Sequence, residues 1–147
     1  VAGAWEGALH GLPALAVSQD VTEEVYNQLK EQGGVPDATL RQSLQNSARH
    51  AATLAGKLLP ATPPQSFTVH NVNFPFPCLT DTPIKSTVPA HLFMPGLFSP
   101  ADDSGSHRLL WTAGRDVSPA GLLTDLACMA DRHISHSVLD YRCLGQG

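Results

Sequence analysis

The chain has 147 residues and a formal net charge of −4, with 42 % hydrophobic and 15 % charged side chains. That length suits one domain or a large part of one, and it is long enough to bury a core. The nine lysines and arginines are scattered rather than clustered, which argues against a nucleic-acid-binding surface. No apolar run reaches the roughly 18 residues that a membrane-spanning helix needs. We therefore expect a globular chain with no nucleic-acid partner and no membrane partner.

Three cysteines, Cys78, Cys128 and Cys143, are too widely spaced to suggest a zinc site or a disulfide framework. We interpret them as buried or idle thiols in a reducing compartment, and the expected location is cytoplasmic.

The first eighteen residues, VAGAWEGALHGLPALAVS, predict a helix that is followed at once by a buried strand. Residues 2–10 are small and apolar at near-helical spacing, and Gly11 supplies the left-handed position at which helices end. Residues 14–17 form a continuous apolar run, which is typical of a strand in a parallel sheet. A helix, a tight turn and a buried strand make half of a βαβ unit, so we expect its first strand to lie before Val1.

The predicted strand ends in a polar corner at residues 18–20. In open α/β sheets, ligands bind beyond the carboxyl ends of the strands, so this corner faces a possible site; a plain polar loop is the alternative. Two helices are expected next, over residues 22–32 and from a cap at Asp37 to a stop at Pro60. The longer one has the apolar spacing of a helix that packs on a core.

Residues 66–74, SFTVHNVNF, read as a strand that contains two unexpected asparagines. Asn71 and Asn73 either make structural hydrogen bonds or lie near a ligand. The tract from Pro60 to Pro100 then holds nine of the twelve prolines, which disfavours regular central strands.

The proline-rich tract therefore predicts an irregular or edge-forming excursion, with a long hairpin arm that returns over residues 107–113. Its turn, residues 102–105, contains an acidic pair. Asp102 and Asp103 could bind a metal, but Asp in a Ser- and Gly-containing turn favours local backbone hydrogen bonds.

A short helix over residues 122–131, capped by Ser118 with Pro119 at its first position, is expected before a last strand at residues 133–141. The pair Thr124–Asp125 is either a polar anchor or a hydrogen bond at the start of the helix.

The histidines suggest no clear site. In the last strand, Ile134, Val138 and His136 should share a face, whereas His133 and His136 should point to opposite faces, which disfavours a metal pair. His70 and His107 are interpreted as packed or solvated. The sequence also contains no nucleophile-elbow motif and no phosphate-binding glycine loop.

Four stretches, in order, resemble the SurE family of metal-dependent survival-protein nucleotidases. They are VAGAWEGALHGLPALAVS, the long helix that leads to NVNFP, the hairpin return DSGSHRLLW, and TDLACMADRHISHSVLDY. The last stretch departs from the family pattern, because Arg132-His133 replaces a usual Gly-Tyr and Ser137-Val138 replaces Thr-Pro.

This resemblance implies the C-terminal part of a SurE-like, Rossmann-like three-layer α/β fold with a protruding β-hairpin. Its expected divisions are the remaining half of the core (residues 1–75), the proline-rich arm (76–115) and a C-terminal helix and strand (116–147). It also implies hydrolysis of phosphomonoesters, typically nucleoside 5′- or 3′-monophosphates, with Mg²⁺ or Mn²⁺, in a homo-oligomer.

The family's metal ligands do not carry over to this sequence. They are an Asp-Asp pair, a Ser and the Asn of a Ser-Gly-x-Asn segment, all of which precede the family's Ser-Gly-Thr stretch and hence Val1. The resemblance thus assigns no catalytic, substrate-binding or metal-ligating residue here. The expectation is a phosphatase portion that binds no metal and is inactive alone, and the alternative is a non-catalytic assembly module derived from the same fold.

Overall fold

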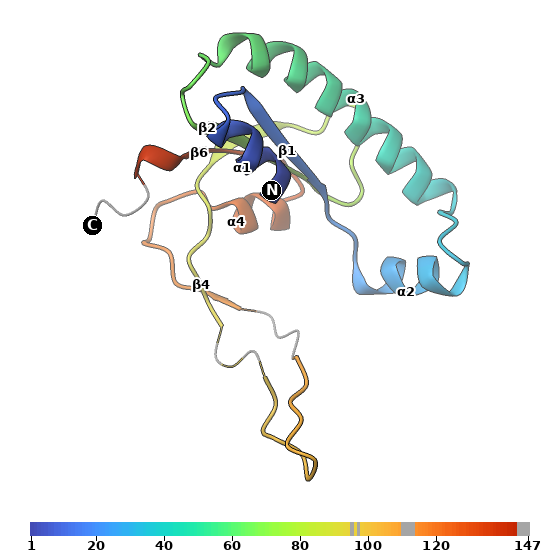
Figure 1. Ribbon diagram of the computed structural model, residues 1–147. Coiled ribbons are helices and arrows are strands. Elements are labelled where there is room, and N and C mark those ends of the chain that lie inside the picture. Colours follow the sequence, from blue (N-terminus) through green and yellow to red (C-terminus); the bar gives the residue numbers. More distant parts are fainter. Residues whose placement is uncertain (95, 97, 110–113, 144–147) are drawn as a thin grey trace.

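A mixed four-stranded sheet forms the centre of the molecule (Figure 1). The computed structural model describes residues 1–94, 96, 98–109 and 114–143. The sheet has the order β1-β2-β6-β3, in which β2 is parallel to β1 and antiparallel to β6, and β3 is parallel to β6. Its strands are β1 (Ala14–Gln19), β2 (Thr68–Phe74), β3 (Ile84–Thr87) and β6 (Ile134–Asp140).

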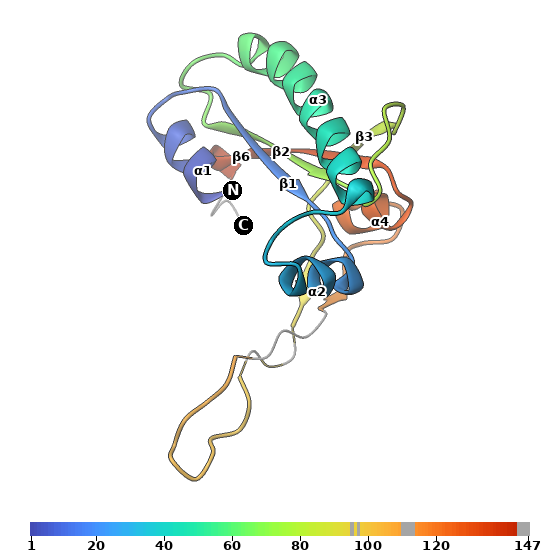
Figure 2. The ribbon, with the colours of Figure 1, turned by 90° about the vertical axis from the view of Figure 1, so that its right-hand side faces the viewer.

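One face of the sheet is covered by the long helix α3 (Ala38–Ala61), which crosses it in Figures 1 and 2. Asp37 caps this helix as predicted, since its carboxylate accepts a hydrogen bond from the Leu40 N–H at 2.7 Å. The helix ends one residue beyond the predicted stop at Pro60. Its apolar stripe packs on β2 and β6 in a core cluster of Leu54, Val72, Phe74, Cys78 and Ile134.

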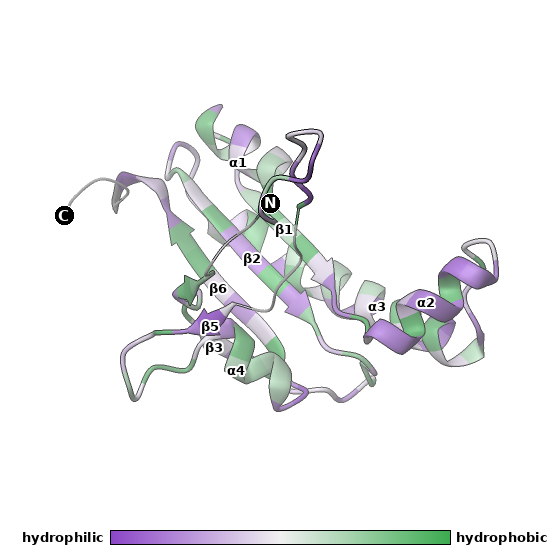
Figure 3. Cartoon of the chain, turned by 90° about the horizontal axis from the view of Figure 1, so that it is seen from below, coloured by the Kyte–Doolittle hydropathy of each residue, from purple (hydrophilic) through white to green (hydrophobic). Residues whose placement is uncertain are grey.

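The opposite face, which Figure 3 shows, is covered at one end by α1 (Ala2–Leu9). A second cluster joins this helix to the sheet through Ala8, Ala14, Ala16 and Val69. Gly11 turns the chain between α1 and β1 with a φ of 80°, a conformation that favours glycine, so the predicted helix–turn–strand is confirmed. The short helix α2 (Glu23–Glu31) lies between β1 and α3 in the chain and matches its predicted position.

The helix α4 (Asp125–Ala130) covers the other end of this face, and its predicted cap was wrong. Thr124 is the N-cap, because its hydroxyl accepts a hydrogen bond from the Ala127 N–H at 3.2 Å. The hydroxyl of Ser118 accepts instead from the His91 N–H at 2.8 Å. The helix begins late because residues 123–125 are tied to Val88 by backbone hydrogen bonds and a parallel bridge.

A long arm protrudes from the core, as Figures 1 and 2 show. Its base is the two-stranded sheet of β4 (Leu92–Phe93) and β5 (Arg115–Asp116), and a bridge joins Phe98 to Leu109 farther out. At the tip, Asp102 accepts hydrogen bonds from Ser104 and Ser106, which confirms the turn interpretation of this acidic residue. Residues 110–113 of the predicted return limb lie outside the described residues.

The proline-rich tract also contributes a strand that the sequence did not predict. β3 joins the main sheet at its edge, and Pro83 and Pro89 fall outside the strand, so no ladder hydrogen bond is lost. The division of the chain into core, arm and C-terminal segment stays a prediction.

Two further observations concern the cysteines and the helices. Cys78 and Cys128 are free and buried, as predicted for them. Within the described part of the chain, no helix is both long and apolar enough to cross a membrane.

Candidate functional site at the ends of β1 and β2

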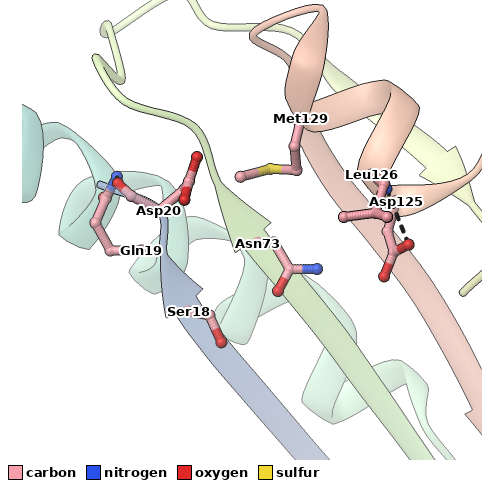
Figure 4. A pocket seen from close by; sticks show the side chains of 7 residues that line it. All are labelled: Ser18, Gln19, Asp20, Asn73, Asp125, Leu126 and Met129. Atoms are coloured by element: carbon pink, nitrogen blue, oxygen red, sulfur yellow. Dashed lines mark hydrogen bonds between the residues drawn. The ribbon is translucent and has the colours of Figure 1, made fainter. Parts of the chain in front are cut away.

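A pocket of about 300 Å³ lies where the parallel strands β1 and β2 end, beside α4. Ligands of α/β sheets bind at such carboxyl ends, and the polar corner of residues 18–20 is part of this pocket as expected. Figure 4 shows the lining side chains, which are Ser18, Gln19, Asp20, Asn73, Asp125, Leu126 and Met129.

Gln19 fixes the corner rather than serving as a free ligand group. Its amide nitrogen donates to the carbonyl oxygens of Phe74 and Pro75 at 3.2 and 3.0 Å, and its amide oxygen accepts from the Ser47 hydroxyl at 2.6 Å. The Asp20 N–H also donates to the Phe74 carbonyl at 2.9 Å. These bonds tie the ends of the two strands to α3, so the pocket has a rigid floor.

Thr124 and Asp125 fix the opposite wall at the start of α4. Besides capping the helix, the Thr124 hydroxyl donates to Asp116 at 3.1 Å. One carboxylate oxygen of Asp125 accepts from the Ala90 and Leu126 N–H groups at 2.8 and 2.9 Å. The helix-start interpretation of this pair is therefore confirmed, while Asp125 also brings negative charge to the pocket.

The two asparagines of β2 differ in their surroundings. Asn73 lines the pocket, and in Figure 4 its amide lies between β1 and α4. Asn71 is on the same face of the strand but is buried, and its Oδ1 has no hydrogen-bond partner among the described residues. The pocket thus brings together Ser18, Asp20, Asn73 and Asp125. The sequence singled out each of these residues separately, but it did not predict that they lie side by side.

The chemistry of this set is that of oxygen ligands. Carboxylates and amide oxygens are what Mg²⁺ and Mn²⁺ prefer. Among the residues that the structure describes, however, no group of three or more His, Cys, Asp or Glu side chains is placed to hold a metal ion. The residues present therefore do not fit a complete site for such an ion, and Asp102 and Asp103 at the tip of the arm do not contribute to the pocket.

A parallel strand pair with polar side chains gathered at its carboxyl end, between helices on both faces, defines a Rossmann-like α/β fold. A sequence model of the survival protein SurE family matches residues 1–93, and the chain belongs to this family.

Among solved structures, the SurE protein from Aquifex aeolicus is similar, with a TM-score of 0.55 and 20 % sequence identity. The alignment covers 99 % of this chain and 54 % of that one, so the chain spans about half the length of the Aquifex protein. At this identity the likeness supports the fold alone, which is the predicted α/β class. No curated protein matches the chain.

Proposed function

We propose that this chain forms one part of a SurE-type phosphomonoesterase that hydrolyses nucleoside monophosphates with the help of Mg²⁺ or Mn²⁺. Membership of the family suggests a phosphatase or nucleotidase. The observation that carries the proposal is the polar pocket at the ends of β1 and β2, whose lining residues Ser18, Gln19, Asp20 and Asn73 lie inside the segment that matches the family.

The pocket residues suit recognition of a phosphate ester better than its cleavage. The Ser18 hydroxyl and the Asn73 amide can hydrogen bond to the hydroxyl groups or phosphate oxygens of a nucleotide. Asp20 and Asp125 would repel a phosphate dianion, so an ester could bind in this pocket only if their negative charge were offset by a cation. A hard dication bound by the complete protein would supply that charge neutralisation.

In this proposal, the 147-residue chain is inactive by itself because its described residues offer no complete site for the dication. The test measures phosphate release by the purified chain from p-nitrophenyl phosphate and from 5′-AMP, in the presence of about 5 mM Mn²⁺ or Mg²⁺. We expect no turnover above the metal-only blank. Metal-dependent turnover by the chain alone would contradict the proposed inactivity.

The same assay on the product of any longer reading frame that contains the chain tests the enzymatic proposal. We expect metal-dependent turnover there, and Asn73→Ala should lower kcat/KM by about tenfold, the size of one lost hydrogen bond. Asn27→Ala, on an exposed face of α2, is the matched control and should leave kcat/KM unchanged. A folded but inactive product would overturn this function.

The second candidate is an assembly module without catalytic activity. It is favoured by the protruding arm, which exposes the apolar side chains of Leu92, Phe93, Phe98 and Leu109. Exposed apolar surface of this kind marks contacts between proteins, and a second copy of the chain is the expected partner. A folded longer product that oligomerises without any turnover would support this candidate over the enzyme.

A further inference from the structure

Two histidines meet on the sheet face that packs against α3, away from the pocket. In the antiparallel register of β2 and β6, Val72 lies opposite His136, so His70 is its diagonal neighbour on the same face. The Nδ1 atom of His70 is 3.0 Å from the Nε2 atom of His136, and the ring centroids are 5.2 Å apart. The pocket residue Asn73 is on the opposite face, because side chains alternate along a strand.

The tautomer of His70 follows from its other neighbour, Thr62. The Thr62 hydroxyl has one proton, and it donates that proton to the Leu58 carbonyl at 2.7 Å, since a carbonyl can only accept. The same hydroxyl oxygen is 2.7 Å from His70 Nε2 and must accept from it. His70 therefore carries its proton on Nε2 and turns the lone pair of Nδ1 toward His136.

We propose that His70 Nδ1 and His136 Nε2 are two protein ligands of a site for a borderline transition-metal dication, such as Zn²⁺ or Ni²⁺. Zinc–nitrogen bonds of about 2.0–2.1 Å at a tetrahedral angle place two ligand nitrogens about 3.4 Å apart. Binding therefore requires the nitrogens to move apart from the present 3.0 Å and both rings to turn, so that each lone pair points at the metal rather than at the other nitrogen. When the metal binds, the His136 ring loses its proton from Nε2 and gains one on its own Nδ1. The His136 ring therefore stays neutral, and no net proton is released.

The surroundings of the pair support this assignment. Ligating histidines commonly donate their second ring N–H to a fixed acceptor, which is the role that Thr62 has toward His70. Val138, which lies opposite His70 at this end of the sheet, is 54 % exposed.

Water completes the coordination in this proposal, because no third His, Cys, Asp or Glu of the described residues joins a metal-holding group. The site is distinct from the metal of the proposed phosphomonoesterase. Imidazole selects Zn²⁺, Ni²⁺ and Cu²⁺, whereas Mg²⁺ prefers oxygen ligands. The inference therefore does not depend on the proposed function.

The test is a titration of the 147-residue chain with ZnCl₂, NiCl₂ and MgCl₂, followed by calorimetry and thermal unfolding. We expect saturable one-to-one binding of Zn²⁺ and Ni²⁺ that raises Tm, and no effect of Mg²⁺. Thr62→Val keeps both ligands but removes the acceptor that orients His70, and it should weaken binding by about 10–100-fold.

His136→Asn should abolish this binding, while His10→Asn, which changes an exposed histidine at the end of α1, should leave it unchanged. X-ray absorption of the nickel-loaded chain should show two imidazole nitrogens at about 2.0–2.1 Å. The proposal is overturned if neither Zn²⁺ nor Ni²⁺ binds, if His136→Asn binds as tightly as the unaltered chain, or if Mg²⁺ has the same effect as Ni²⁺.

Discussion

Each imidazole of the pair formed by His70 and His136 resists protonation in the folded chain. Burial lowers the pKa of both rings, and the positive charge of a protonated His136 lowers that of His70 further. In the unfolded chain, both return to an ordinary value near 6.5. The unfolded chain therefore binds more protons below that pH, so the free energy of unfolding falls as the pH decreases from 6.5 through the lower pKa values of the folded state.

This dependence predicts a specific change in a variant. With metals removed by EDTA, the unaltered chain should lose more free energy of unfolding between about pH 7.5 and pH 5.5 than His136→Gln, since glutamine does not titrate. Urea unfolding at the two pH values measures the difference. His107→Gln, in the exposed arm, is the control and should keep the pH dependence of the unaltered chain. A variant His136→Gln with an unchanged dependence would contradict the prediction.

At the scale of elements, local chemistry predicted most of the fold. Periodicity and capping gave α1, α2 and α3, and β-branched and apolar runs gave β1, β2 and β6 with small errors at their ends. The turn at Asp102 was also predictable, because the hydrogen bonds of its Asp carboxylate and of the following backbone N–H groups are made within five residues.

What escaped prediction depends on contacts between distant residues. β3 is short and lies among prolines, and only pairing with β6 identifies it as a strand. The start of α4 was misplaced because Val88, far away in sequence, holds the preceding residues extended. The same reason hid the convergence of Ser18, Asn73 and Asp125 on one pocket, since no local pattern links three separate elements.

Two glycines allow the role of the backbone in these elements to be measured. Gly11, with φ of 80°, joins α1 to β1, and a Cβ there would lie 3.0 Å from the Cγ of Gln65. Gly11→Ala should therefore destabilise the chain by about 1–2 kcal/mol. Gly56 is an exposed residue of α3 with nothing near its Cβ position, so Gly56→Ala should stabilise the chain by about 0.5–1 kcal/mol. Thermal unfolding of both variants measures these opposite signs, and two shifts in the same direction would contradict the argument.

At the scale of the whole molecule, two surfaces favour association. In the described part of the chain, β1 pairs with β2 on one side only, and its Val17 is 53 % exposed. The arm extends well away from the core and carries Phe93 and Phe98, which are 55 and 61 % exposed. Unpaired strand edges and exposed aromatic side chains both bind other chains, but the arm presents the larger apolar side chains.

The last prediction assigns this association to the arm. The unaltered chain should form oligomers in light scattering after size exclusion, in a concentration-dependent manner, and Phe93→Ser with Phe98→Ser should shift it toward the monomer. Val35→Ser removes an equally exposed apolar side chain (58 %) from the loop between α2 and α3, and it should have no effect. A monodisperse monomer of the unaltered chain would contradict association altogether. A lysine on an edge strand blocks strand pairing, so Val17→Lys tests the edge of β1 while the arm stays intact. If Val17→Lys dissociates the oligomer and the arm variant does not, the contact is the strand edge and not the arm.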